Sequence, residues 1–163
     1  MSKIIETLKS FPKVFWVSNT MELFERWAWY GFYMAFALYL MESKDTGALG
    51  FTAAQKGIIM GTGSMLLYFL PLFTGAIADR IGYKVVLLLS YTMYVSGYYM
   101  LSAFESYEMI FAAYIYLAVA GALFKPIISA MISKTTNSQN ASIGFGIFYM
   151  MINIGGFIGP FIA

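Results

Sequence analysis

The stretch Glu22-Leu-Phe-Glu25-Arg26-Trp-Ala-Trp-Tyr-Gly31 sets three ionised side chains into an otherwise apolar and aromatic segment. In a helix, Glu22, Glu25 and Arg26 project from one face, and Glu22 and Arg26 stand in the i,i+4 order that favours an ion pair. That pairing leaves Glu25 in need of a second cation. Charged groups at membrane depth are costly unless paired or hydrated, so by default they mark an ion or substrate pathway.

The composition predicts an all-α integral membrane protein. Hydrophobic residues make up 60% of the 163 residues and charged residues only 11%, whereas a soluble domain is roughly a quarter charged. The net charge of +2 is small and scattered, so no nucleic-acid partner is expected. The chain has no Cys and no His, which excludes thiolate metal sites and leaves proton handling to carboxylates. We expect no metal and no cofactor.

The apolar runs predict a helical bundle of about five transmembrane spans. After a cytoplasmic N-terminal segment at 1–13, the expected transmembrane bundle covers 14–163, and each run is close to the roughly 20 residues that cross a bilayer. Pro71 is expected to kink the second span, and Asp79 to Lys84 is expected to form a tight polar turn. The sequence stops at Ala163 inside an apolar run, so a truncated chain is expected. The predicted spans are 14–41, 52–78, 85–104, 109–132 and 143–163.

The distribution of Lys and Arg predicts a cytoplasmic N-terminus in the cell (inner) membrane. With that orientation the outer segments hold only Lys44 and Lys56, and the excess of positive charge lies inside, as the positive-inside rule requires. The inner positive charges are Lys3, Lys9, Lys13, Arg80, Lys84 and Lys134.

A second intramembrane cation occurs at Lys125, in Ala120-Gly-Ala-Leu-Phe-Lys125-Pro126 of the fourth span. Glu22 and Glu25 against Arg26 and Lys125 sum to zero, and a neutral cluster on two helices suits a membrane bundle. One interpretation is that these charges only hold the first and fourth spans together. The other is an ion or substrate pathway, which Pro126 favours because it removes a backbone donor and can open the helix beside Lys125.

Four motifs in chain order resemble those of the proton-coupled oligopeptide transporters, a branch of the major facilitator superfamily. The Glu-x-x-Glu-Arg stretch with Trp29-Tyr30-Gly31 resembles the first-helix signature of that family. Phe124-Lys125-Pro126 resembles its fourth-helix lysine motif, and Phe148-Tyr149-Met-Met-Ile-Asn153-Ile-Gly155 resembles its fifth-helix signature. The superfamily's loop motif between the second and third helices is matched by Gly75, Asp79, Arg80, Gly82 and Lys84.

The resemblance implies the N-terminal portion of a proton-coupled symporter that imports di- and tripeptides by alternating access. Its partners would be a peptide, protons, the lipid bilayer and a missing C-terminal helical half. It implies proton coupling by Glu22, Glu25, Arg26 and Lys125, and a cytoplasmic gate at the loop motif. The substrate-binding residues that it implies are Tyr30, Tyr33, Tyr68, Lys125 and Asn153.

Two positions depart from the family pattern. The family commonly carries an arginine seven positions after the motif arginine, where this chain has Tyr33, and an asparagine after Lys-Pro, where this chain has Ile127. Both differences remove polarity from the expected cavity. A carrier for another small solute therefore stays open, as does a non-transporting assembly or sensor subunit. A membrane enzyme ranks lower, because the chain has no His or Cys and no acidic cluster beyond Glu22 and Glu25.

Small and polar residues also predict helix packing. Gly57-x-x-x-Gly61 and Gly155-x-x-x-Gly159 are expected to leave flat surfaces on which neighbouring backbones pack closely. Asn153, in the fifth span, is expected to be a buried amide that forms an interhelical hydrogen bond when it has no substrate role.

Overall fold

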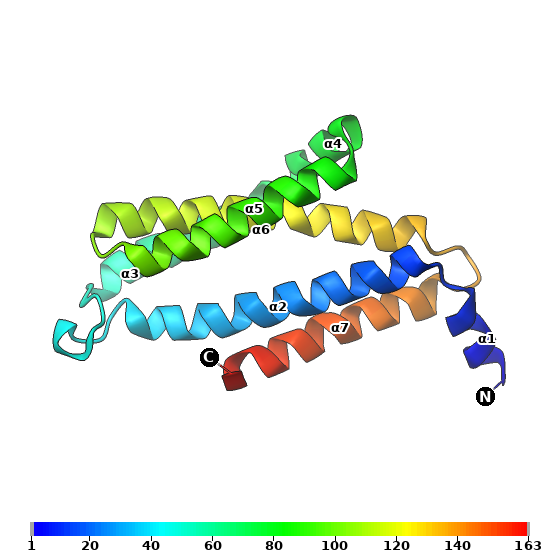
Figure 1. Cartoon of the computed structure of the whole chain (residues 1–163), viewed down its shortest axis with the longest axis horizontal. Coiled ribbons are helices and arrows are strands. Elements are labelled where there is room, and N and C mark those ends of the chain that lie inside the picture. Colours follow the sequence, from blue (N-terminus) through cyan, green and yellow to red (C-terminus); the bar gives the residue numbers. More distant parts are fainter. Residues whose placement is uncertain (1, 163) are drawn as a thin grey trace. The chain divides into compact units, whose positions relative to one another are not determined.

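The computed structural model describes residues 2–162, and within that range every regular element is a helix. The all-α prediction is therefore confirmed. The elements along the chain are a short first helix, five long helices, the short helix α4 and one 3-10 turn (Figure 1). They are α1 (Ser2–Ser10), α2 (Lys13–Tyr39), η1 (Lys44–Thr46), α3 (Ala53–Phe69), α4 (Pro71–Ile81), α5 (Tyr83–Ala103), α6 (Tyr107–Lys134) and α7 (Ala141–Ile162).

Length and composition alone qualify three helices, α5, α6 and α7, as membrane spans. A fourth is obtained if α3 and α4 are counted as one span, bent by 50° at the break between them. The proline predicted to kink this span, Pro71, is the first residue of α4, where its missing N–H and fixed φ are tolerated. The helix that holds the opening stretch, α2, has 27 residues, enough to cross a bilayer, but its charges set it apart from the uniformly apolar spans.

Local sequence signals fix several helix ends. Thr52 caps α3 in a capping box, accepting from the Gln55 backbone N–H at 3.2 Å while its own N–H donates to the Gln55 side chain at 2.9 Å. The turn expected at Asp79 to Lys84 is shorter than predicted. Helix α4 continues through Asp79, and Gly82 alone, at φ +94°, separates α4 from α5. This backbone region is strained for any residue with a Cβ.

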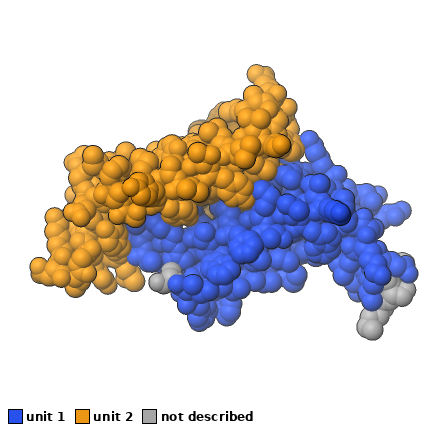
Figure 2. All heavy atoms as spheres, viewed as in Figure 1, with its two compact units in different colours: residues 1–36, 128–163 blue, residues 37–127 orange. Residues whose placement is uncertain are grey.

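The described chain divides into two compact units, coloured separately in Figure 2. One unit comprises Met1–Phe36 and Ile128–Ala163, and so contains α1, most of α2, the last turns of α6, and α7. The other unit is Ala37–Ile127, which contains α3, α4, α5 and the first five turns of α6.

In the first unit, α2 and α7 lie side by side and run in the same direction (Figure 1). Gly155 faces the carbonyl of Leu23, and Gly159, one turn later, faces the carbonyl of Trp27. A Cβ added to these glycines would lie 2.5 Å and 2.6 Å from those oxygens. The prediction of close packing is therefore confirmed for α7. It is not confirmed for Gly57 and Gly61 of α3, because an added Cβ at either meets nothing within 4 Å among residues 2–162.

In the second unit, α3 and α5 pack against α6 through other glycines. Gly63 of α3 lies under the ring of Tyr114, and Gly97 of α5 lies against Leu117, where an added Cβ would be 3.1 Å from the leucine Cδ1. Helix α6 is the most buried of the three apolar spans, with 56% of its most apolar window inside the protein. The motif of Lys125 and Pro126 therefore lies on the helix around which this unit packs.

Candidate functional site

A stripe of buried polar residues runs along one side of α2 through the opening stretch. Glu22, Glu25 and Arg26 expose only 4%, 7% and 5% of their surface. Ser18 and Asn19, one turn earlier, are buried as well. Positions 18, 19, 22, 25 and 26 share one helix face, so α2 buries its polar groups together. Burial of three ionised groups is tolerable only when they are paired.

Arg26 pairs with both glutamates, but unequally. Its Nε donates to Glu25 Oε2 at 2.5 Å, and its Nη2 contacts the same oxygen. The Nε atom lies 3.4 Å from Glu22 Oε1. The expected Glu22–Arg26 pair is therefore present, while the expectation that Glu25 would lack a partner on α2 is wrong. Helical spacing singled out the i,i+4 pair, whereas the long arginine side chain also turns back to the residue that directly precedes it.

Helix α7 holds this arginine in place from the other side. Gly155 leaves no room for a side chain, since an added Cβ would lie 2.8 Å from the Cβ of Arg26. The guanidinium carbon lies 5.9 Å from the ring centroid of Tyr30, within the range of a cation–π contact. Tyr30, a residue predicted to bind substrate, is thereby brought to the arginine, with 39% of its surface exposed.

Lys125 of α6 is partly buried and lies over an aromatic ring of α3. Its Nζ is 4.8 Å from the ring centroid of Tyr68, again a cation–π distance. Tyr68 is 75% exposed, so its ring is open to other contacts. Two residues predicted on separate spans are therefore in contact. Lys125 and the α2 cluster belong to different units, and the pairing of Lys125 with a glutamate stays a prediction.

Pro126 creates a gap in α6 that a side chain of α4 fills. A proline has no N–H, so the carbonyl four residues earlier, at Ala122, loses its helical donor. The buried hydroxyl of Thr74 donates to that carbonyl at 2.7 Å, and Gly75 packs beside the proline ring. The i−4 rule allowed the vacant carbonyl to be deduced from the sequence. Sequence reasoning missed Thr74, because only the tertiary fold brings it there.

We expect Thr74→Val to destabilise the protein more than Ser90→Ala. Both hydroxyls donate to carbonyls of α6, Ser90 to Ala120 at 2.8 Å, but Ala120 keeps the helical donor of Phe124. A buried carbonyl left without any donor costs about 1–3 kcal/mol, against about 1 kcal/mol for an ordinary hydrogen bond. Unfolding of each variant in mixed micelles measures the difference, and equal losses would show that the proline gap is satisfied in another way.

The loop motif lies at the junction of α4 and α5. Asp79 and Arg80 are exposed on the last turns of α4, and Lys84 is exposed on the first turn of α5. Asp79 accepts a hydrogen bond at 2.7 Å from the hydroxyl of Tyr83, the residue that follows Gly82. The motif therefore joins the two helices by a side-chain bond across a one-residue break.

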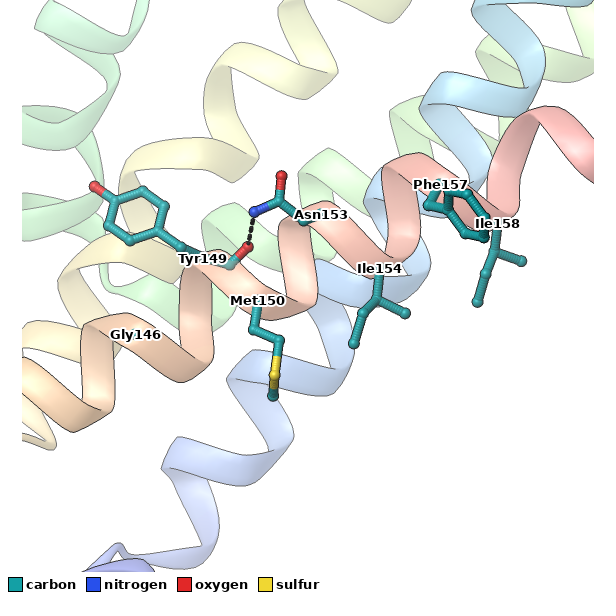
Figure 3. Close-up of a pocket in the computed structure, with 7 residues that line it drawn as sticks. All are labelled: Gly146, Tyr149, Met150, Asn153, Ile154, Phe157 and Ile158. Carbon is teal, nitrogen blue, oxygen red and sulfur yellow. Dashed lines mark hydrogen bonds between the residues drawn. The ribbon is translucent and has the colours of Figure 1, made fainter.

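The two remaining predicted substrate residues, Tyr33 and Asn153, contact neighbours on their own helices. Tyr33 is half-buried and stacks on Trp29, with 6.3 Å between ring centroids. Asn153 is exposed, and its amide donates to the Tyr149 carbonyl of its own helix at 2.8 Å, so the expectation of a buried interhelical bond is wrong. It lines an open, apolar hollow of about 680 Å³ along α7 (Figure 3). The residues that line the hollow are Gly146, Tyr149, Met150, Asn153, Ile154, Phe157 and Ile158.

Between residues 2 and 162, no three acidic, His or Cys side chains are grouped closely enough to hold a metal ion. What the cluster on α2 can do is bind and release a proton, because it holds two carboxylates against one guanidinium. Lys125 and Arg26, each over a tyrosine ring, can also bind an anionic group.

The family model of the Major Facilitator Superfamily matches residues 20–163, and the chain belongs to that superfamily. Within it, the similarity is to peptide transporters, as the four motifs predicted. The chain is 32% identical over 148 residues to dipeptide and tripeptide permease B of Xenorhabdus bovienii, covering 88% of this chain and 29% of the relative. It is 31% identical to the permease of the same name from Aeromonas hydrophila, covering 93% and 30%.

Solved structures agree with this placement. The crystal structure of peptide transporter POT in complex with sulfate superposes with a TM-score of 0.84 at 25% identity, over 92% of this chain and 31% of that one. The chain therefore spans about 30% of the length of the curated relatives that it matches.

Proposed function

We propose that this chain is the N-terminal portion of a proton-coupled symporter that imports di- and tripeptides. The observation that carries the proposal is the buried cluster of Glu22, Glu25 and Arg26 on α2. Ion pairs at membrane depth are rare without a use in ion or substrate movement. The chain's similarity to dipeptide and tripeptide permeases supports peptides as the substrate class.

Proton coupling follows from the charge count of the cluster. Two carboxylates and one guanidinium carry a net charge of −1, so binding of one proton makes the cluster neutral and less costly to keep out of water. We propose that Glu22 or Glu25 takes this proton. When both are ionised, the second positive charge is supplied by Lys125 of α6. A proton therefore frees Lys125 from this pairing, and the helices are then able to move.

The peptide's carboxylate would compete for the same cations. Arg26 lies over Tyr30 and Lys125 over Tyr68, so each site offers a positive group beside an aromatic ring on which a peptide side chain or backbone can pack. Tyr33 carries no positive charge, so Arg26 and Lys125 are the two cations proposed to bind the peptide carboxylate. Asn153, on the apolar hollow of α7, would contact the uncharged part of the substrate.

The competition between proton and peptide predicts how substrates are recognised. A dipeptide that has a free C-terminal carboxylate should displace labelled substrate from the complete carrier more effectively than its C-terminal amide. Equal competition by the two would mean that neither cation binds a carboxylate. A carrier for another small solute is the second candidate, and Tyr33 favours it because it stands where the family commonly has an arginine.

The junction of α4 and α5 is proposed as the cytoplasmic gate. Asp79, Arg80 and Lys84 are exposed there, and the bond from Tyr83 to Asp79 ties the two helices together. For this end of the bundle to open, any charged group that pairs with Asp79, Arg80 or Lys84 would have to separate from it. The 50° bend between α3 and α4 supports this proposal, because a gate on the short helix α4 would move separately from α3.

We further propose that the N-terminus lies in the cytoplasm and the segment between α2 and α3 lies outside. The chain has no native Cys, so a single cysteine at Ser43 reports the side directly. We expect an impermeant maleimide to label it in intact cells, and a cysteine at Arg80 to be labelled only after the cells are opened. The reverse pattern would contradict the orientation.

A further inference from the structure

Asn19, one turn before Glu22 on α2, holds a buried acceptor that the proposed function does not yet use. Its side chain is 1% exposed, and its Nδ2 donates to the carbonyl of Phe15 at 2.9 Å. Its carbonyl oxygen Oδ1 is buried and receives no hydrogen bond from the described residues. Rotating the amide by 180° would point this oxygen at the Phe15 carbonyl, so the assignment of the two amide atoms is determined by the contact.

The neighbours of Asn19 show that this is not a general feature of α2. The hydroxyls of Ser18 and Thr20 donate to the carbonyls of Val14 and Trp16 at 2.8 Å and 2.9 Å, and each has an ordinary helical partner. A buried carbonyl without a donor carries a cost in free energy. An amide oxygen kept at that cost beside an ionisable cluster indicates a donor that is present in only one state of the protein.

Glu22 is the residue that can supply such a donor. It is three residues further along α2, on the same face, and it is also buried, with 4% of its surface exposed against 1% for Asn19. An ionised carboxylate only accepts hydrogen bonds, whereas a protonated carboxyl has one O–H to donate. The alternative donor, Arg26, directs both its Nε and its Nη2 to Glu25 Oε2. Protonation of Glu22 therefore creates a donor at the helical spacing that the vacant oxygen requires.

Outside the cluster on α2, the described charged side chains of this unit are exposed, whereas Asn19 and Glu22 are buried. Helix α7, which packs on this part of α2 at Gly155 and Gly159, contains no Asp, Glu, Lys or Arg, and its one titratable side chain, Tyr149, is exposed. Glu6 lies in the middle of α1 and Lys9 near its end, Lys13 is the first residue of α2, and Lys134 is the last residue of α6.

We propose that Asn19 is the positioning residue for the transported proton, and that its amide oxygen accepts the hydrogen bond of protonated Glu22. The inference rests on the proposed function and deepens it by choosing between the two glutamates. Glu22 takes the proton from the outer solution, Glu25 stays ionised beside Arg26, and the cluster is then neutral. Release of the proton to the cytoplasm restores the carboxylate and leaves the Asn19 oxygen without a donor again.

The direct test is infrared difference spectroscopy of the purified complete carrier in lipid as the pH is lowered. Protonation of a carboxyl gives a C=O stretching band, and a hydrogen bond donated by that carboxyl lowers its frequency. We expect Glu22→Gln to abolish the band, Asn19→Leu to move it to higher frequency, and the matched control Ser18→Ala to leave it unchanged. A band that Asn19→Leu does not move, or that only Glu25→Gln abolishes, would overturn the proposal.

A second variant and a transport measurement complete the test. Asn19→Ala removes the amide without adding bulk, so a band shift shared by both Asn19 variants cannot come from a misfit of leucine. In the complete carrier, the pH of half-maximal uptake should fall by about one unit for Asn19→Leu, which is a tenfold weaker binding of the proton. Wild-type uptake that does not depend on the pH gradient would refute the proposed function. The infrared bands would still show whether Asn19 accepts a hydrogen bond from protonated Glu22.

Discussion

Lys125→Ala is expected to abolish peptide uptake driven by a pH gradient, while exchange of substrate between the two sides of the membrane survives. Lys125 is the one cation within the apolar part of α6, and the proposed coupling needs it when both glutamates of α2 are ionised. Without it, one glutamate must keep its proton throughout the cycle, and an empty carrier that has lost its proton can no longer return. Exchange does not require that step.

The measurement compares gradient-driven uptake with counterflow in liposomes that contain the complete carrier. Lys134→Ala serves as the matched control, because it removes a positive charge from the exposed end of the same helix. We expect the control to retain both activities. Gradient-driven uptake that Lys125→Ala leaves undiminished would reduce Lys125 to a structural contact of Tyr68, and the coupling would then fall to α2 alone.

Gly155→Ala should destabilise the protein by about 1–3 kcal/mol, the usual cost of overpacking. The added Cβ would lie 2.5 Å from the Leu23 carbonyl oxygen and 3.0 Å from the Trp27 nitrogen. Both are backbone atoms that no rotamer change can move, so α2 and α7 must separate. The same displacement would shift Arg26, whose Cβ would lie 2.8 Å away.

Gly146→Ala makes the same chemical change on the same helix and serves as its control. An added Cβ there meets no described atom within 4 Å, and alanine is favoured over glycine in a helix by about 1 kcal/mol. Its stability should therefore be unchanged or raised. Unfolding by SDS in mixed micelles, followed by tryptophan fluorescence, measures both variants. Equal stabilities for the two would contradict the close approach of α2 and α7.

The charged stretch of α2 shows how far the sequence could lead. Helical spacing alone brought Glu22, Glu25 and Arg26 to one face, because three ions in an apolar segment have few acceptable arrangements. Spacing could not predict how closely the flexible side chain of Arg26 approaches each of the two carboxylates. It ranked the i,i+4 pair first, whereas the shorter contacts go to Glu25.

The glycine motifs show a second limit. Gly57-x-x-x-Gly61 and Gly155-x-x-x-Gly159 are equivalent as sequence patterns, yet only the second packs against another helix in the described chain. A small-residue pattern says that a close neighbour is allowed, and it does not say that one is present. The prediction for Asn153 was wrong because the sequence does not say which partner its amide takes. An amide in an apolar run needs a partner, and the carbonyl of Tyr149 on its own helix satisfies it.

Thr74 and Asn19 could not have been selected from the sequence. Threonine and asparagine are common residues. No sequence pattern near Thr74 indicates that its hydroxyl donates to the carbonyl of α6 that Pro126 leaves without a helical donor. Asn19 became informative only when its oxygen was found buried and without a donor. Motifs identify residues that a family shares, whereas contacts of this kind depend on which side chains the fold brings together.

Proton-driven uptake of a labelled dipeptide by the complete carrier in liposomes tests the central claim most directly. With the outside acidic and the inside neutral, we predict accumulation of the dipeptide above its external concentration, together with alkalinisation of the medium that depends on the peptide. Glu22→Gln should remove both effects. Equilibration without accumulation, and with no movement of protons, would contradict the account.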